Sequence, residues 1–364
     1  MTRKAEAILY ASQWQLMWRK FRSHKLAVVS LGFLAVLYLL VAFAQFVAPY
    51  DPRERHSERI NAPPQRIRVW ENGRFQWPFV YAYQQELDEN TLAWVYSEDR
   101  SHRFALRFFV HSYRYRLLGV AYTDMHFVRV DEPGTLHLLG TDSLGRDVFS
   151  RLIIGGQISL SIGLVGIALS FVIGSLLGGL SGYYGGTVDM IIQRLIEFLV
   201  SLPTLPLWMG LAAAVPVTWP TTRIYFMMTV ILSLVSWTGL ARVVRGKILS
   251  VREEDYVMAA RLSGAGQWWI LRRHLLPSLF SYMLVSLTMA IPGMILGETA
   301  LSFLGLGLQP PAISWGVLLQ GAQNVRSIAL YPWLLSPAVA IVVTVLCFNF
   351  VGDGLRDAVD PYVR

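Results

Sequence analysis

Long apolar runs separated by short charged stretches are the main feature of the hydrophobic pattern of this chain. The runs cover residues 26–48 and, further along, lie near 158–180, 191–215, 225–249, 279–301 and 333–351. Each run is long enough to cross a hydrocarbon core of about 30 Å as a helix that rises about 1.5 Å per residue. The first run is longer than a signal-peptide core of about 7–15 residues. The pattern therefore predicts an all-α polytopic membrane protein with six transmembrane helices, the first being 26–48.

Residues 49–153 interrupt this pattern between the first two apolar runs. They are rich in Arg, Asp, Glu and aromatic residues, and several prolines divide them. Short alternating stretches such as residues 104–110 indicate strands. We interpret 49–153 as a folded extracytoplasmic insert between transmembrane helices 1 and 2.

The orientation follows from the basic residues in the short connecting segments. Residues 1–25 and the loop 250–278 are rich in Lys and Arg, whereas the short loops of opposite parity offer only Arg223 and Arg326. Short cytoplasmic loops carry an excess of positive charge. We therefore predict that residues 1–25, the loop and the tail 354–364 are cytoplasmic, with the transmembrane core at 154–353.

Residues 3–22 fit an amphipathic helix on the membrane surface. Trp14, Met17, Trp18 and Phe21 fall on one face of such a helix, and basic residues lie near its end. A plain basic flank before the first span is an equally good interpretation.

Composition supports the membrane assignment and excludes nucleic acid as a partner. Only 15% of the residues are charged, against about a quarter in soluble domains. The formal net charge is +8, but all four lysines flank apolar runs, as membrane anchors do. Cys347, the only cysteine, lies inside an apolar run, so the chain has no internal disulfide and no cysteine-based metal cluster.

Motifs for catalysis, metal binding or nucleotide binding are missing from the sequence. No H-E-x-x-H or G-x-S-x-G occurs, and no two histidines have zinc-ligand helical spacing. Gly246-Lys247 is followed by Ile248, so this is not a P-loop. We expect no catalytic residue, no metal and no cofactor in this chain. If ATP drives it, a partner subunit must bind the ATP and its Mg.

Four glycines repeat at every fourth position in and after the second apolar run. They are Gly174, Gly178, Gly182 and Gly186. Such a stripe of small residues lets another membrane helix approach closely. A sliding surface and static close packing both fit the pattern.

Two acidic residues lie in apolar runs. Glu197 follows Arg194 by three residues, which favours a helical ion pair. Glu298, with Ser302 one turn later, is a candidate for the translocation path or a gate; bonding to the backbone of a re-entrant turn is the other interpretation. Two scattered acids do not form a proton relay, so proton-coupled secondary transport is disfavoured.

The loop 250–278 contains the most informative short pattern. Asp255 suits the N-cap or first turn of a short helix, and Ala259 and Ala260 give that helix a flat face. Gly264 allows the chain to leave the helix, and Pro277 suits the first turn of the next span. A helix of this kind fits the cleft of another protein, although an inert surface helix has the same spacing.

The loop resembles the "EAA" loop of ABC-importer permeases. The matching positions are Ala259, Ala260, Gly264, His274, Leu276 and Pro277. Met258 stands where the family has Glu, and His274 stands where it has Ile. Both departures, with Asp255-Tyr256 ahead of them, resemble the dipeptide/oligopeptide permease branch.

Two further segments resemble the "C-type" subunit of the same branch. Residues 139–151 are similar to its stretch before span two, and residues 298–316 to its stretch after span five. The resemblance covers about residues 137–361 and leaves 49–136 unmatched.

The resemblance implies the type I ABC importer fold and a multi-subunit importer in the bacterial inner membrane. Its other members would be a homologous second permease, two cytoplasmic ABC ATPases and a periplasmic solute-binding protein. The loop 250–278 would contain the coupling helix that docks on an ATPase. ATP binding would then push this helix and reorient the spans, and hydrolysis would reset them.

The cargo and the role of the insert stay open at this point. Oligopeptides are the leading cargo, with oligosaccharides, opine-like compounds or nickel as alternatives. Residues 49–136 either cradle the binding protein or pack on the second permease. A membrane receptor or sensor would account for an external insert, but not for six spans or the loop.

Overall fold

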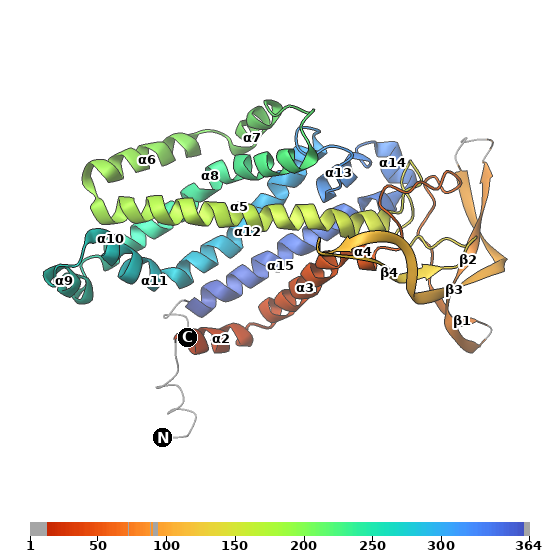
Figure 1. Cartoon of the computed structure of the whole chain (residues 1–364), viewed down its shortest axis with the longest axis horizontal. Coiled ribbons are helices and arrows are strands. Elements are labelled where there is room, and N and C mark those ends of the chain that lie inside the picture. Colours follow the sequence, from red (N-terminus) through yellow and green to blue (C-terminus); the bar gives the residue numbers. More distant parts are fainter. Residues whose placement is uncertain (1–12, 72, 88, 90–93, 360–364) are drawn as a thin grey trace, which may run out of the picture. The chain divides into compact units, whose positions relative to one another are not determined.

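The computed structural model describes residues 13–71, 73–87, 89 and 94–359 (Figure 1). The chain forms two compact units. The first unit is built from residues up to 35, residues 162–301 and residues from 342 onward; the second is built from residues 36–161 and 302–341. Several long helices contribute residues to both units.

Among the described residues, five helical segments are long and apolar enough to cross a membrane. They are α3 (Lys25–Ala42), α5 (Val148–Tyr184), α8 (Thr221–Val251), α12 (Phe280–Phe303) and η2 with α15 (Pro332–Leu335 and Ser336–Val359). Within the apolar windows of these segments, between 22% and 50% of the residues are buried inside the chain. The remaining apolar surface is outside the protein core, as expected for helices that face lipid.

The segment predicted as a single third span, 191–215, is broken in the structure. It consists of α6 (Gly186–Ser201) and α7 (Thr204–Ala213), which meet at an angle of 86°. Pro203 explains the break, because proline has no N–H for the helix and forces the preceding residue into an extended conformation. Leu202 has that conformation, with φ −84° and ψ 133°. The described chain has six spans only if this bent pair counts as one.

The N-terminal helix α2 (Gln13–Ser23) confirms the predicted helix from residue 13 onward; residues 3–12 lie outside the described part. Its apolar residues are divided between two environments. Met17 and Phe21 are buried, whereas Trp14 and Trp18 are 53% and 54% exposed. The exposed rings and the basic residues at the helix end are typical of a helix at a membrane surface.

A four-stranded antiparallel sheet occupies much of the segment 49–153. Its strands are β1 (Arg68–Glu71), β2 (Arg74–Leu87), β3 (Trp94–Leu117) and β4 (Ala121–Val130), in the order β1-β2-β3-β4. The first part of β3 pairs with β2 and its second part pairs with β4. The strand expected near 104–110 lies within β3. The spans of the described chain are helical, as predicted. The segment 49–153 is different, because it contains a β-sheet.

The remaining helices are short connections. They are α4 (Ala44–Val47), α9 (Asp255–Leu262), α10 (Gln267–Ile270), the π-helix η1 (Leu271–Leu275), α11 (Leu276–Ser278), α13 (Trp315–Gln320) and α14 (Val325–Leu330).

The loop before α5 is held by a buried His–Asp pair. The Nδ1 of His137 lies 3.0 Å from Oδ1 of Asp147, and both side chains are almost fully buried. The other oxygen of Asp147 accepts bonds from the backbone N–H and the hydroxyl of Ser150, each at 2.7 Å. Asp147 therefore serves as the N-cap of α5. This explains why an Asp stands there in the segment 139–151.

His56 packs beside this pair. Its ring centroid lies 5.3 Å from that of His137, and its backbone N–H donates to the carbonyl of Gly145. Gly145 has φ +71°, and a Cβ there would lie 2.1 Å from the carbonyl oxygen of His56. Only glycine fits this crossing of two loops.

Acidification should loosen the loop that contains His56. Burial, followed by the electrostatic effect of the neighbouring His137, lowers the pKa of His56 below its usual 6.5. The unfolded segment therefore binds a proton at a higher pH than the folded one, so stability falls as the pH drops below about 6.5. Hydrogen exchange at the amides of residues 56–61 in the purified protein should accelerate over this range. In a His56→Gln variant the pH dependence should become much weaker; an equally steep dependence in that variant would contradict the assignment.

Three of the four striped glycines bring α5 against α8 within the first unit. A Cβ on Gly174, Gly178 or Gly182 would lie 2.9, 2.4 or 2.9 Å from a backbone carbonyl oxygen of α8. Gly186 does not share this contact. It begins α6 with φ +54° and has no atom within 4 Å of a Cβ position, because the chain turns there.

Gly178→Ala should destabilise the protein, because the added methyl group would collide with the backbone of Ala241. We expect a loss of about 1–3 kcal/mol, seen as a lower unfolding temperature of the detergent-purified protein. Gly239→Ala in α8 is the matched control, since a Cβ there has open space. Equal unfolding temperatures for the two variants would show that α5 and α8 are not closely packed.

Candidate functional site

The loop between α8 and α12 folds onto the ends of its neighbouring helices. Residues 250–278, here called the coupling loop, contain α9, α10, η1 and α11. Asp255 is the first residue of α9, and Glu254 occupies the N-cap position without a side-chain capping bond. Asp255 is thus an acidic residue in the first turn of α9. Its negative charge interacts favourably with the positive N-terminal end of the helix dipole.

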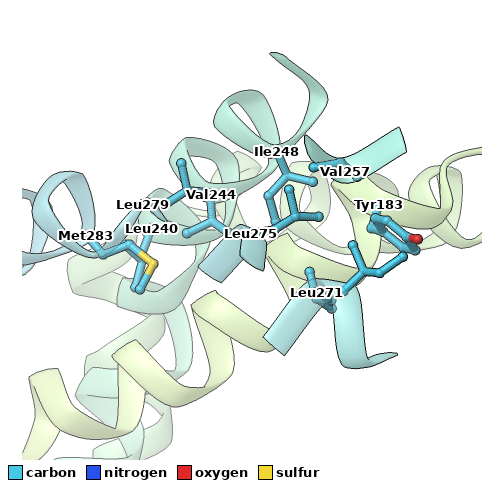
Figure 2. Close-up of a cluster of buried hydrophobic side chains, with 10 residues drawn as sticks. Tyr183, Leu240, Val244, Ile248, Val257, Leu271, Leu275, Leu279 and Met283 are labelled. Atoms are coloured by element: carbon cyan, nitrogen blue, oxygen red, sulfur yellow. The ribbon is translucent and has the colours of Figure 1, made fainter. Parts of the chain in front are cut away.

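One buried residue attaches α9 to the rest of the first unit. Val257 is fully buried in an apolar cluster with Val244 and Ile248 of α8 and Tyr183 of α5 (Figure 2). The other members come from the end of α8 and from the chain between α10 and α12: Leu240, Ile270, Leu271, Leu275, Leu279 and Met283. A single cluster therefore joins α9 to α5, to α8 and to the start of α12.

The two alanines of the predicted flat face have different surroundings. Ala260 is half-buried and packs against this cluster, whereas Ala259 is exposed. Tyr256 and Met258 are also exposed, each to 44%. Ala259, Tyr256 and Met258 therefore form the outward surface of α9, and Ala260 contributes mainly to its internal packing.

Gly264 ends α9 in the way its sequence position predicted. It has φ +78°, and its N–H donates to the carbonyl of Arg261, while the N–H of Ala265 donates to the carbonyl of Ala260. These two bonds form a Schellman motif. Ala260 and Ala265 both pack against the apolar cluster that holds Val257. A side chain at Gly264 has open space but would strain the backbone at this φ.

The chain enters α12 through a widened helical turn. The N–H of Leu276 donates to the carbonyl of Leu271, five residues back, which is the π-helical pattern. Pro277 lies in the first turn of α11, close to its predicted place at the start of span five. Because Pro277 has no N–H and its ring crowds the preceding turn, the helix widens there.

His274 and Leu276 have distinct neighbours within this turn. His274 is half-buried, with ring centroids 4.9 Å from Trp269 and 6.2 Å from Tyr256. Leu276 packs on the apolar cluster. His274 therefore connects α9 to the π-helical segment, a contact that no spacing rule indicates.

The second half of the coupling loop forms an open pocket of about 530 Å³. It is lined by Trp268, Trp269, Arg272, Arg273 and Pro277. Both tryptophans are about half exposed. The pocket offers aromatic faces and positive charge next to the outward surface of α9.

An ion pair that sequence analysis did not find fastens α6 to α8 near the same end. Arg245 donates from Nε and from one guanidinium NH₂ to the two oxygens of Asp189, each at 2.6 Å. Ser181 of α5 also donates to Asp189, and Arg252 donates to the carbonyl of Gly182. The partners are far apart in sequence, so only the fold reveals the pair. The simpler pair between Arg194 and Glu197 is present at 2.8 Å, as predicted.

The candidate path residues are buried. Glu298 is fully buried in α12. Ser302 is also fully buried; its hydroxyl accepts a bond from the N–H of Leu308, and its carbonyl accepts one from Gln320. Ser302 thus orders the chain that follows α12.

The described residues offer little for metal or nucleotide chemistry. In this part of the chain, no three His, Cys, Asp or Glu side chains come together in a way that could hold a metal ion. Gly246 and Lys247 lie inside α8, where the backbone N–H groups belong to the helix. The Nζ of Lys247 lies 4.0 Å from the ring centroid of Tyr282. This segment therefore has no phosphate-binding loop.

Comparison with known proteins gives the family. Residues 170–364 match the binding-protein-dependent transport system inner membrane component family. Residues 12–64 match the N-terminal transmembrane domain of oligopeptide transport permease C. Residues 65–169, which include the sheet, lie between the two matches.

Several permeases of known systems are similar to this chain. The oligopeptide transport system permease protein OppC of Haemophilus influenzae is 41% identical over 229 residues, covering 63% of this chain and 71% of OppC. The dipeptide transport system permease protein DppC of Bacillus subtilis is 40% identical over 234 residues, covering 64% of this chain and 71% of DppC. The OppC of Bacillus subtilis is 36% identical over 245 residues, covering 67% of this chain and 78% of that OppC.

These matches and the apolar helices define an inner-membrane permease subunit. The chain belongs to the binding-protein-dependent transport system inner membrane component family, within its OppC/DppC-like branch of ABC-importer permeases.

Removing the apolar attachment of α9 should release this helix. Val257→Ala would leave a cavity and cost about 1–3 kcal/mol of local packing. Hydrogen exchange at the amides of α9 should become faster, while exchange in the middle of α8 stays unchanged. Met258→Ala is the matched control, because that side chain is exposed. If α9 exchanges equally in both variants, Val257 does not hold it.

Proposed function

We propose that the coupling loop receives a cytoplasmic ABC ATPase and transmits its motion to the spans of an importer for oligopeptides. The complex would contain this chain, a homologous second permease, two ATPase subunits and a periplasmic solute-binding protein. Both termini and the coupling loop would be cytoplasmic, and the sheet would be periplasmic. ATP and Mg would bind in the ATPase subunits only.

The observation that carries this proposal is the two-sided character of α9. Its inner side is locked by Val257 into the cluster formed with α5, α8 and the start of α12. Its outer side presents Ala259 between larger exposed residues. A push on the outer side therefore reaches several membrane helices through packed side chains, without slack in a flexible linker. An inert surface helix would need no such attachment.

The pocket beside α9 supports a protein partner at this place. Tryptophan and arginine are the residues most often found as strong contacts in protein interfaces. Trp268, Trp269, Arg272 and Arg273 are gathered there around one opening. We infer that the ATPase covers this pocket as well as the outward surface of α9.

Peptide cargo is proposed from the relatives. The similar proteins are named as oligopeptide, dipeptide and glutathione permeases. Oligosaccharides, opine-like compounds and nickel are the alternative cargoes. Glu298 and Ser302 stay our candidates for the path or a gate, and their burial means that they would become accessible only after the helices move.

Placing a large charge on the outward surface of α9 should uncouple the importer. In Ala259→Arg we expect peptide uptake to fall at least about tenfold, because the guanidinium would prevent close approach of the ATPase. Uptake should be measured in cells, and retention of the ATPase should be measured after detergent purification. Ala259→Ser is the matched control and should keep both, because it adds a single oxygen.

Two results would contradict the proposal. Normal uptake and ATPase retention in a well-expressed Ala259→Arg variant would mean that α9 is not the docking surface. Purification of the wild-type chain with signalling proteins and without an ATPase would instead favour a membrane receptor. Ala259 is better suited to this test than Ala260 or Gly264, because substitution at either of those sites also disturbs packing or backbone geometry within the chain.

A further inference from the structure

A row of exposed aromatic rings crosses the second unit from the end of the first span onto the sheet. Phe46 of α4 lies 6.1 Å from Phe109 and 6.0 Å from Phe127 between ring centroids. Phe127 lies 5.6 Å from Phe108, which in turn lies 6.1 Å from Trp77. The four rings on the sheet are between 38% and 63% exposed. We call these five residues the aromatic row.

The backbone is bent out of its regular form to assemble this row. Phe109 has φ +56°, a left-handed conformation that is rare for a bulky residue and costs about 1–2 kcal/mol. Successive side chains of a regular strand point to opposite faces. Here the consecutive rings of Phe108 and Phe109 both lie within 6 Å of Phe127. Such a costly arrangement is expected where the exposed rings have a use.

The tip of the β3–β4 hairpin is also apolar and open. Leu118 and Val120 lie in the turn and are 61% and 86% exposed. Arg116 stacks on the ring of Tyr122, with its guanidinium carbon 4.8 Å from the ring centroid. Exposed aliphatic residues at a hairpin tip, next to an amphipathic Arg–Tyr pair, are unusual for a surface that meets only water.

Chain connectivity places the row at the height of the lipid headgroups. Phe46 lies four residues beyond Ala42, the last residue of the apolar helix α3, and most of these residues are helical. Four helical residues advance about 6 Å, and each headgroup region is about 5–8 Å thick. The row thus begins just beyond α3, and only 22% of the residues in the apolar window of α3 are buried within the chain. Figure 1 shows α4 beside β3 and β4.

We propose that the β3–β4 hairpin is a membrane-interface anchor. The aromatic row and the hairpin tip would lie in the headgroup region of the leaflet on the insert's side, next to α3. Aromatic side chains favour this region because their rings are apolar and tolerate partial hydration. Arg116 would reach lipid phosphates. The anchor would fix the sheet against the membrane independently of the transmembrane helices.

Site-specific fluorescence quenching can test this anchor in the assembled importer. The only cysteine, Cys347, is first replaced by Ser, and single cysteines are then introduced by Phe109→Cys and Val120→Cys. Each is labelled with an environment-sensitive fluorophore and reconstituted into nanodiscs. Leu87→Cys is the matched control, because Leu87 is an exposed apolar residue (48%) at the β2–β3 end of the sheet, outside the aromatic row. Val120 tolerates substitution best, since its side chain is almost fully open.

Lipids with a doxyl group near the headgroup should quench the labels at 109 and 120 at least about twofold more than the label at 87. Aqueous iodide should show the opposite preference. Iodide quenching at both 109 and 120 would overturn the proposal and leave the row in water. Protection from both reagents would also overturn it, because a second permease or a binding protein would then cover the row.

Discussion

Hydrocarbon offers the backbone no hydrogen-bond partners, and this constraint shapes the whole chain. Each unsatisfied peptide group in lipid costs several kcal/mol, so the chain crosses as long helices that satisfy their own groups. Within the described part of the chain, α6 and α7 form a bent pair that meets at 86°, at the Leu202–Pro203 step. Irregular structure, polar networks and strands are found in the connections. The coupling loop and the segment that contains the sheet are two of these connections.

Close packing replaces apolar burial as the force between helices in such a molecule. Lipid tails are as apolar as leucine, so helix contacts depend on shape and on a few polar bonds. Gly174, Gly178 and Gly182 allow α5 to touch the backbone of α8, and the Asp189–Arg245 pair fastens α6 to α8. The end of these helices is the place where α9 is attached through Val257. A coupling element placed on closely packed helices can pass on force, whereas one placed on loosely packed helices would lose it.

The sheet poses a different physical problem. It carries more exposed aromatic surface than water alone would favour, and Phe109 adopts a strained conformation that adds to this surface. The aromatic row begins within a turn of the end of α3. Contact with the lipid interface accounts for both the exposure and the strain, and it gives the insert a physical role that needs no contact with the transported solute.

The sequence alone determined the apolar runs of the five unbroken spanning helices in the described chain, the helix of the coupling loop and its end at Gly264. These features depend on apolar run length and on local backbone preferences, both of which can be read from neighbouring residues. The strand near 104–110 could be predicted for the same reason. Pro203 is also a local indication of a helix break. The apolar run continues through it, however, so the sequence predicted a single span there.

Only the tertiary structure decided which face of each element is used. From the sequence, Ala259 and Ala260 were expected to form one flat face of the helix. In the structure Ala260 packs against the apolar cluster, whereas Ala259 is exposed to solvent. Gly186 continued the glycine stripe in sequence, but the chain turns there and removes it from the contact with α8. The Asp189–Arg245 pair and the aromatic row join residues far apart in the chain. Contacts of this kind depend on how the elements pack, and no local pattern of residue types contains that information.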